Sequence, residues 1–218
     1  MKKITILTIG SLMILFQASA QTNVKSNSNP YNELDKILSP FEDMTEYALD
    51  NNYEGVIKSI NKVEALQKQS IFKENILSGS IETLNPKIKK LNEAAKQKNY
   101  KQVALIATDI FEFNISNFKD RYKIKNQIQI EHMDYMGFET LALLNQDNID
   151  WEKLESTIID VKKNWKVLSL KVKDRNLKDS FGFLFQGLLL STKNKDIKMT
   201  KILASMDLSL VDVLEKSI

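Results

Sequence analysis

Apolar residues recur at alternating intervals of three and four positions along most of the chain. One such series runs from Tyr53 to Leu66 and another from Met199 to Val213. The longest series without a break consists of Trp151, Leu154, Ile158, Val161, Trp165, Leu168 and Val172. This spacing places the apolar side chains on one face of an α-helix. Because the 218 residues include only six glycines and three prolines, the pattern predicts an all-α protein.

Short polar turns separate these helices at a nearly constant interval. The segments DNNY, QKNY, QDNI and KNKDI end at Tyr53, Tyr100, Ile149 and Ile197, at intervals of 47, 49 and 48 residues. In each turn an Asn or Asp comes just before an aromatic or β-branched residue, so its side chain can cap the incoming helix. The interval predicts about four αα-hairpins of about 48 residues, which form one or two up-down helical bundles made of two similar four-helix halves.

Two prolines mark expected helix starts in the first half. Ser39, Pro40 and Glu42 have the order of a capping box with proline at the first helical position. Asn85 and Pro86 repeat the cap and the proline 46 residues later. A helix start at residue 40 leaves residues 21–38 as a flexible or short helical lead.

The predicted elements form two sets of four helices joined near residues 117–125. Short polar connections between long helices require antiparallel neighbours, so either two bundles or one continuous stack of hairpins satisfies the pattern. The first half covers residues 39–118 and the second half residues 125–218. The helices are expected at about residues 40–51, 53–71, 78–97, 100–118, 125–146, 150–173, 176–193 and 196–217.

The N-terminal 20 residues have the organisation of a secretory signal peptide. Lys2 and Lys3 precede an apolar run from Ile4 to Phe16, and Ala18-Ser19-Ala20 provides small residues at the cleavage site. The apolar run is shorter than the about 20 residues that a membrane span requires. Cleavage after Ala20 predicts a mature protein in the periplasm or outside the cell, with no membrane span.

Charge and cysteine content exclude several classes of function. The signal peptide removes two of the 31 basic residues and none of the 28 acidic ones, which leaves a net charge of +1. A nearly neutral chain with interspersed charges is not typical of a nucleic-acid binder. The absence of cysteine excludes thiolate nucleophiles, cysteine-bound zinc and iron–sulfur clusters.

Few residues are available for catalysis. The chain has a single histidine and contains no HExxH, GxSxG or phosphate-binding glycine motif, so an enzyme is not expected. In the segment EHMDYM, His132 and Met136 share a helix face and Met133 lies beside it, a combination that suits copper(I). The alternative is that these methionines fill gaps in the core.

Aromatic residues provide a second candidate site. The helix containing SFGFLFQGLLL, residues 180–190, is apolar on nearly all sides. Phe181 and Phe185, with Trp165 and Phe111 from other helices, can line a pocket for an apolar ligand or a protein partner; the alternative is that they belong to the core. Four acids beside the apolar series are expected on helix flanks, paired with lysine or solvated: Asp109, Asp160, Asp207 and Asp212.

Together these features predict an exported periplasmic binding protein without catalytic activity. Its ligand is expected to be an unidentified protein or an apolar small molecule, with no cofactor. The alternative function is copper binding by His132, Met133 and Met136.

Overall fold

The computed structural model describes residues 29–217 of the chain. Residues 1–28 and 218 lie outside the described residues, and so does the predicted signal peptide. The described part contains nine α-helices, one short 3₁₀ helix and no β-strand apart from a single bridge between Ile76 and Phe118. The prediction of an all-α protein is therefore confirmed.

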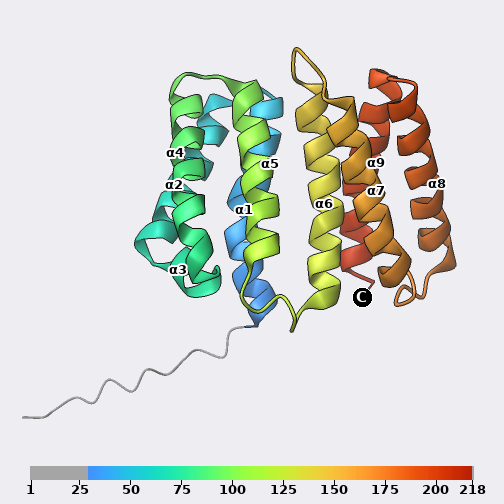
Figure 1. Cartoon of the computed structure of the whole chain (residues 1–218), viewed down its shortest axis with the longest axis horizontal. Coiled ribbons are helices and arrows are strands. Elements are labelled where there is room, and N and C mark those ends of the chain that lie inside the picture. The colour runs from blue at the N-terminus through green and yellow to red at the C-terminus, as the bar shows by residue number, and fades with distance from the viewer. Residues whose placement is uncertain (1–28, 218) are drawn as a thin grey trace, which may run out of the picture.

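The long helices lie side by side, and those that follow one another in the chain run antiparallel (Figure 1). All eight predicted helices are present. The helix α3 was not predicted, and α1 begins ten residues earlier than expected. The elements are α1 (Pro30–Leu49), α2 (Tyr53–Lys68), α3 (Ile71–Asn75), the 3₁₀ helix (Ser78–Ser80), α4 (Ile81–Lys96), α5 (Tyr100–Asn117), α6 (Lys125–Leu144), α7 (Trp151–Leu168), α8 (Arg175–Lys193) and α9 (Ile197–Glu215).

Neither proline is part of a helix cap, because Pro40 lies inside α1 and Pro86 inside α4. The expected helix start at residue 40 is therefore wrong, whereas the expected helix over residues 78–97 already contained Pro86. Proline in a helix removes one hydrogen bond to the carbonyl group four residues earlier. Those earlier residues, Lys36 and Glu82, occupy exposed positions, where water can replace the lost bond. The sequence around Pro40 has the composition of a helix start, but the apolar series continues through it.

The actual start of α1 uses the same capping chemistry at a different place. The Asn29 side chain accepts a hydrogen bond from the Tyr31 amide at 3.1 Å, and Pro30 occupies the first helical position. Leu34 and Ile37 in the next turns are completely buried. Residues 30–38 are thus helical, in agreement with the helical alternative for the lead, and they continue without a break into the rest of α1.

The polar turns cap the following helices as predicted. Three turns also share one backbone geometry, with a residue of positive φ just before the cap: Asn51 at 55°, Lys98 at 53° and Lys195 at 54°. In the remaining turn the cap is Asp150 and not the expected Asn148. The capping residues are Asn52, Asn99, Asp150 and Asp196, whose Oδ1 atoms accept amide hydrogen bonds at 3.0, 3.2, 2.9 and 3.0 Å.

Glycine at position 195 is expected to stabilise the protein. A lysine with positive φ carries a steric cost of about 1–2 kcal/mol, which glycine would relieve. Glycine also gives the unfolded chain more conformational entropy, and this offsets part of the gain. Lys195→Gly should therefore raise the free energy of unfolding by about 0.5 kcal/mol, measured by denaturant titration. Lys90→Gly is the control, because Lys90 is exposed inside α4. That variant should lose about 1 kcal/mol. A loss of stability in Lys195→Gly would contradict the assigned turn geometry.

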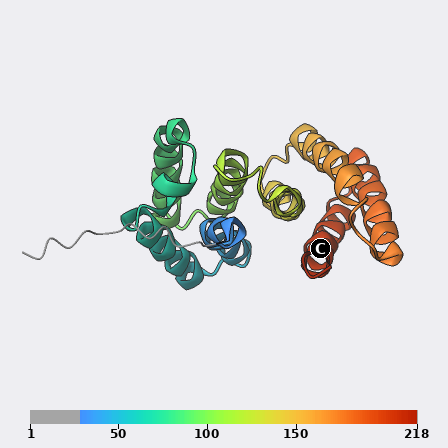
Figure 2. The same cartoon turned by 90° about the horizontal axis from the view of Figure 1, so that it is seen from below.

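Two hydrophobic cores lie side by side. Helices α1 to α5 surround the first core and α6 to α9 surround most of the second, as the views in Figures 1 and 2 show. Helix α6 joins them: Ala142 packs with the first core, and Met133 packs with the second. The side of α6 not covered by α5 and α7 faces α1 and α9, and the site described next lies there.

Candidate functional site

The aromatic residues proposed to bind a partner lie in the cores. Phe111 is 2 % exposed and belongs to the first core, whereas Trp165, Phe181 and Phe185 belong to the second. The Trp165 and Phe181 rings pack with centroids 4.5 Å apart. None of the four lines either of the two surface hollows described below, a cavity between α1, α6 and α9 and a groove along α9. Their burial agrees with the alternative interpretation, a role in packing.

The three residues proposed to bind copper are in two environments. Met133 and Met136 are completely buried in the second core. His132 is partly buried; burial lowers its pKa, and the nearby Glu112 carboxylate on α5 acts in the opposite direction. The other candidate thioethers are dispersed, since Met44 lies in the first core and Met206 is half exposed on α9.

The four acids beside the apolar series have different surroundings. Asp109 pairs with Lys87, and Asp160 pairs with Lys163 at 2.7 Å, as expected. Asp212 is exposed and lines the acidic cavity.

For Asp207 the expectation of an exposed flank position is wrong, because this residue is completely buried and neither carboxylate oxygen has a hydrogen-bond partner. It packs against Gly137 of α6. Its Oδ2 atom lies 3.0 Å from the point that a Cβ atom at position 137 would occupy. Burial raises the pKa of Asp207 well above its ordinary value.

A cavity of about 480 Å³ lies between α1, α6 and α9. Seen from below in Figure 2, α6 (yellow-green) lies between α1 (blue) and α9 (red). Eight acids line this acidic cavity, together with Tyr31, Phe138, Ser205, Leu208 and Ser209. No lysine or arginine of the described part of the chain lines it. The acids are Asp35, Glu42, Asp43 and Glu46 of α1, Glu131 and Asp134 of α6, and Asp212 and Glu215 of α9.

Three of these acids converge. Glu42, Glu131 and Asp134 each offer one carboxylate oxygen, and the three oxygens lie within 4.8 Å of one another. Glu131 is only 4 % exposed. Among the described residues, Asp43 is the only one of the eight acids with an ion pair, to Lys62 at 2.6 Å. The converging carboxylates therefore have no basic side chain to neutralise them.

Burial and neighbouring carboxylates raise the pKa of each converging acid. Burial, followed by the Asp35 and Glu215 carboxylates, raises the pKa of Glu42 to about 8. Burial and then Glu42 raise the pKa of Glu131 well above its ordinary value, an effect that the Tyr31 hydroxyl partly offsets. Burial and then Glu131 act in the same direction on the pKa of Asp134. With a pKa of about 8, Glu42 is mostly protonated at neutral pH when no cation is bound.

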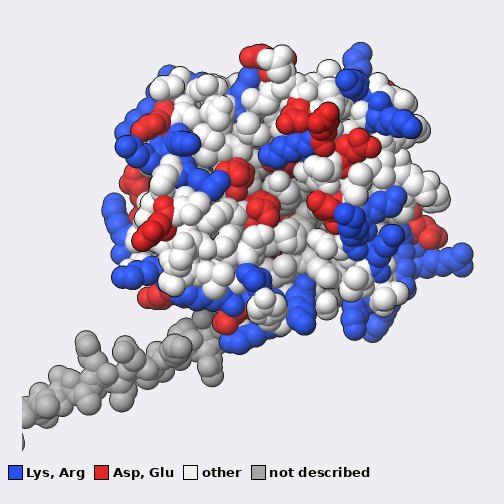
Figure 3. All heavy atoms as spheres, viewed as in Figure 1, with Lys and Arg blue, Asp and Glu red and all other residues white. Residues whose placement is uncertain are grey.

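Another buried acid of α6, Glu139, is neutralised by a basic side chain of the same protein. Glu139 is completely buried, forms an ion pair with Lys153, and accepts a hydrogen bond from the Thr108 hydroxyl at 2.8 Å. On the face of the molecule shown in Figure 3, basic and acidic residues are likewise interspersed. The acidic cavity differs from the Glu139 site and from this surface, because the ionisable side chains that line it are nearly all acidic.

The sequence does carry a signal for this site. Glu131 and Asp134 are three residues apart on α6 and lie on either side of His132, the residue that suggested copper. Acids also occur at helical spacing on α1, at Glu42 and Glu46, and on α9. The sequence does not show that these three helices are neighbours, and Glu42 was assigned to a capping box.

Comparisons of the chain with protein families, with curated proteins and with solved structures found no match. Among the described residues, no helix combines the length and the apolar character needed to cross a membrane.

Proposed function

We propose that this chain is an exported binding protein without catalytic activity, and that its acidic cavity binds a divalent cation. The proposed direct ligands are Glu42, Glu131 and Asp134. The observation that carries the proposal is the convergence of three carboxylates with no basic partner among the described residues; Glu131 is buried, and Glu42 and Asp134 are partly buried. Export is supported by the composition of residues 1–20.

The spacing of the three oxygens suits one ion. Calcium binds oxygen ligands at about 2.3–2.6 Å, so two ligands on opposite sides of the ion are about 4.6–5.2 Å apart. Oxygens that all lie within 4.8 Å of one another can therefore share one ion. Carboxylates with no nitrogen or sulfur ligand favour hard cations, namely calcium, magnesium or manganese.

A cation would also remove the electrostatic cost of the site. Carboxylates buried close together are unfavourable when ionised, unless an opposite charge or a proton neutralises them. Among residues 29–217, no lysine or arginine lines the cavity. A divalent ion would supply positive charge and displace the proton of Glu42, whose pKa is about 8, so binding should strengthen as the pH rises toward 8.

Copper binding by His132, Met133 and Met136 remains the alternative proposal. Both thioethers would have to leave the second core to reach an ion at the surface. The acidic cavity requires no such rearrangement, and we therefore favour a hard cation over copper(I).

The proposal predicts that Glu131→Gln weakens cation binding by about tenfold or more, because it removes one ligand and its charge. Isothermal titration of the chelator-treated protein with calcium, magnesium and manganese at pH 8 measures this loss. Asp160→Asn is the matched control, since Asp160 pairs with Lys163 on the exposed side of α7. Wild-type protein that binds none of the three cations, or equal affinities in wild type and Glu131→Gln, would refute the proposal.

We also propose that the bundle is a repeat of αα-hairpins of about 48 residues in two similar halves. The support is the shared turn geometry at Asn51, Lys98 and Lys195, at intervals of 47 and 97 residues. The halves differ between their second and third helices. There the first half has α3 and the 3₁₀ helix, and the second half has only a short connection.

A further inference from the structure

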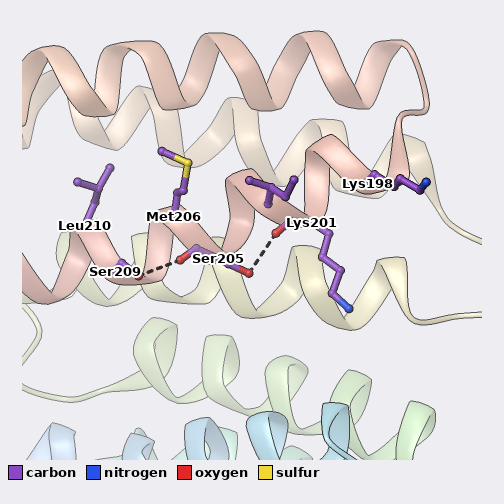
Figure 4. Close-up of a pocket in the computed structure, with 7 residues that line it drawn as sticks. Lys198, Lys201, Ser205, Met206, Ser209 and Leu210 are labelled. Atoms are coloured by element: carbon purple, nitrogen blue, oxygen red, sulfur yellow. Dashed lines mark hydrogen bonds between the residues drawn. The ribbon is translucent and has the colours of Figure 1, made fainter.

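The outer face of α9 is apolar and has no packing partner in the described chain. Ile202, Met206 and Val213 lie along this face and are 55 %, 49 % and 52 % exposed. An open groove of about 780 Å³ runs along it (Figure 4). We call it the α9 groove; its lining residues are Lys198, Lys201, Ile202, Ser205, Met206, Ser209 and Leu210.

The two serines do not make the α9 groove polar. The Ser205 hydroxyl donates to the Lys201 carbonyl oxygen at 3.1 Å, and the Ser209 hydroxyl donates to the Ser205 carbonyl oxygen at 3.2 Å (Figure 4). Each donor is therefore satisfied within its own helix. Small side chains four residues apart leave space for the backbone of another helix to approach closely.

The charges along α9 are arranged in the opposite way to that favoured by the helix dipole. A helix is stabilised by acids in its first turn and bases in its last turn. Helix α9 has neither; Lys198 and Lys201 lie toward its N-terminus, and Asp212 and Glu215 lie toward its C-terminus. All four are exposed. A second α9 helix running antiparallel would bring basic and acidic ends together.

We propose that the α9 groove binds α9 of a second copy of this chain, in an antiparallel pair about a two-fold axis near Met206. Such an interface is isologous, so each contact occurs twice. Lys201 of one copy then faces Asp212 of the other, while Ile202, Met206 and Val213 become covered. The proposed cation ligands lie on α1 and α6 and not on α9, so this inference does not depend on the proposed function.

The pair also brings a positive charge to the acidic cavity. Ser205 and Ser209 line both the α9 groove and the acidic cavity, and Asp212 lies in the cavity lining. Lys201 of the second copy would thus reach the rim of the first copy's acidic cavity, which no lysine or arginine among the first copy's described residues lines.

Charge exchange tests the proposed pair directly. In sedimentation equilibrium with chelator present, wild-type protein should dimerise with increasing concentration. Lys201→Asp and Asp212→Lys should each weaken the dimer by about tenfold or more, because each creates two pairs of like charges. An equimolar mixture of the two variants should regain association, since both pairs in the mixed dimer then have opposite charges.

Two further variants test the apolar part of the α9 groove. Met206→Lys should abolish dimerisation, whereas Phe183→Lys is the control, because Phe183 is 71 % exposed on α8 and does not line the groove. Circular dichroism verifies that each variant folds. Wild-type protein that stays monomeric at all concentrations, Met206→Lys that dimerises normally, or a mixture of charge variants that does not associate would each overturn the proposal.

Discussion

The free energy of unfolding of the cation-free protein is expected to fall as the pH rises from about 4.5 to about 8. In that interval the Glu42 carboxyl of the unfolded chain, which has an ordinary pKa, loses its proton. The partly buried Glu42 of the folded chain, with a pKa of about 8, keeps its proton. The folded state therefore binds more protons than the unfolded state, and raising the pH favours unfolding. Below about pH 4.5 the group is protonated in both states and this cost is absent.

Glu131 and Asp134 act in the same direction, since their pKa values are also raised in the folded protein. Each unit of pKa difference corresponds to about 1.4 kcal/mol, so Glu42 alone contributes a few kcal/mol. His132 acts in the opposite direction below its ordinary pKa, because burial lowers its folded pKa. Other titratable groups surround the three acids. They are Asp35, Asp43, Glu46 and Lys62 of α1 and α2, Asp207, Asp212 and Glu215 of α9, and the Tyr31 hydroxyl.

Denaturant unfolding at pH 5 and pH 8, in the presence of chelator, measures this effect. Glu131→Gln should lose less stability than wild type between the two pH values, because it removes one of the titrating acids. A saturating divalent cation should restore stability at pH 8 and have little effect at pH 5. Equal loss of stability between pH 5 and pH 8 in wild type and Glu131→Gln would contradict the assignment of Glu131 to the site.

The sequence predicts the helices well because the apolar series and the caps are local signals. The series through Trp151 and Val161 predicts α7, and Asn52, Asn99 and Asp196 cap helices as expected. The errors arise where tertiary packing overrides a local signal. Pro40 resembles a helix start, but complete burial of Leu34 and Ile37 outweighs the loss of one backbone hydrogen bond.

The candidate site was not predictable in the same way, because it depends on which helices are neighbours. Glu42 and Glu131 are 89 positions apart in sequence, and each alone is typical of a solvated helix residue. The burial of Asp207 could not be predicted from the sequence for the same reason. Asp207 is buried because Gly137 of α6 has no side chain, which lets α9 pack closely against α6. Residue type indicated His132 as chemically special, whereas the three-dimensional arrangement indicates the acids beside it.

Val161→Asp should unfold the protein or lower its free energy of unfolding by about 4 kcal/mol or more. Val161 lies in the middle of α7, is 3 % exposed and belongs to the second core. A carboxylate there would be buried with no positive partner, which costs several kcal/mol even if the group takes up a proton.

Val167→Asp provides a matched control for this prediction. Val167 lies on the same helix but is 58 % exposed, so the same substitution should change stability by no more than about 0.5 kcal/mol. Thermal or denaturant unfolding of the two variants separates burial from helix propensity, because the exchanged residues are identical. If both variants unfold like the wild type, α7 does not present Val161 to the second core. If both are strongly destabilised, the cause is the loss of helix propensity and not burial.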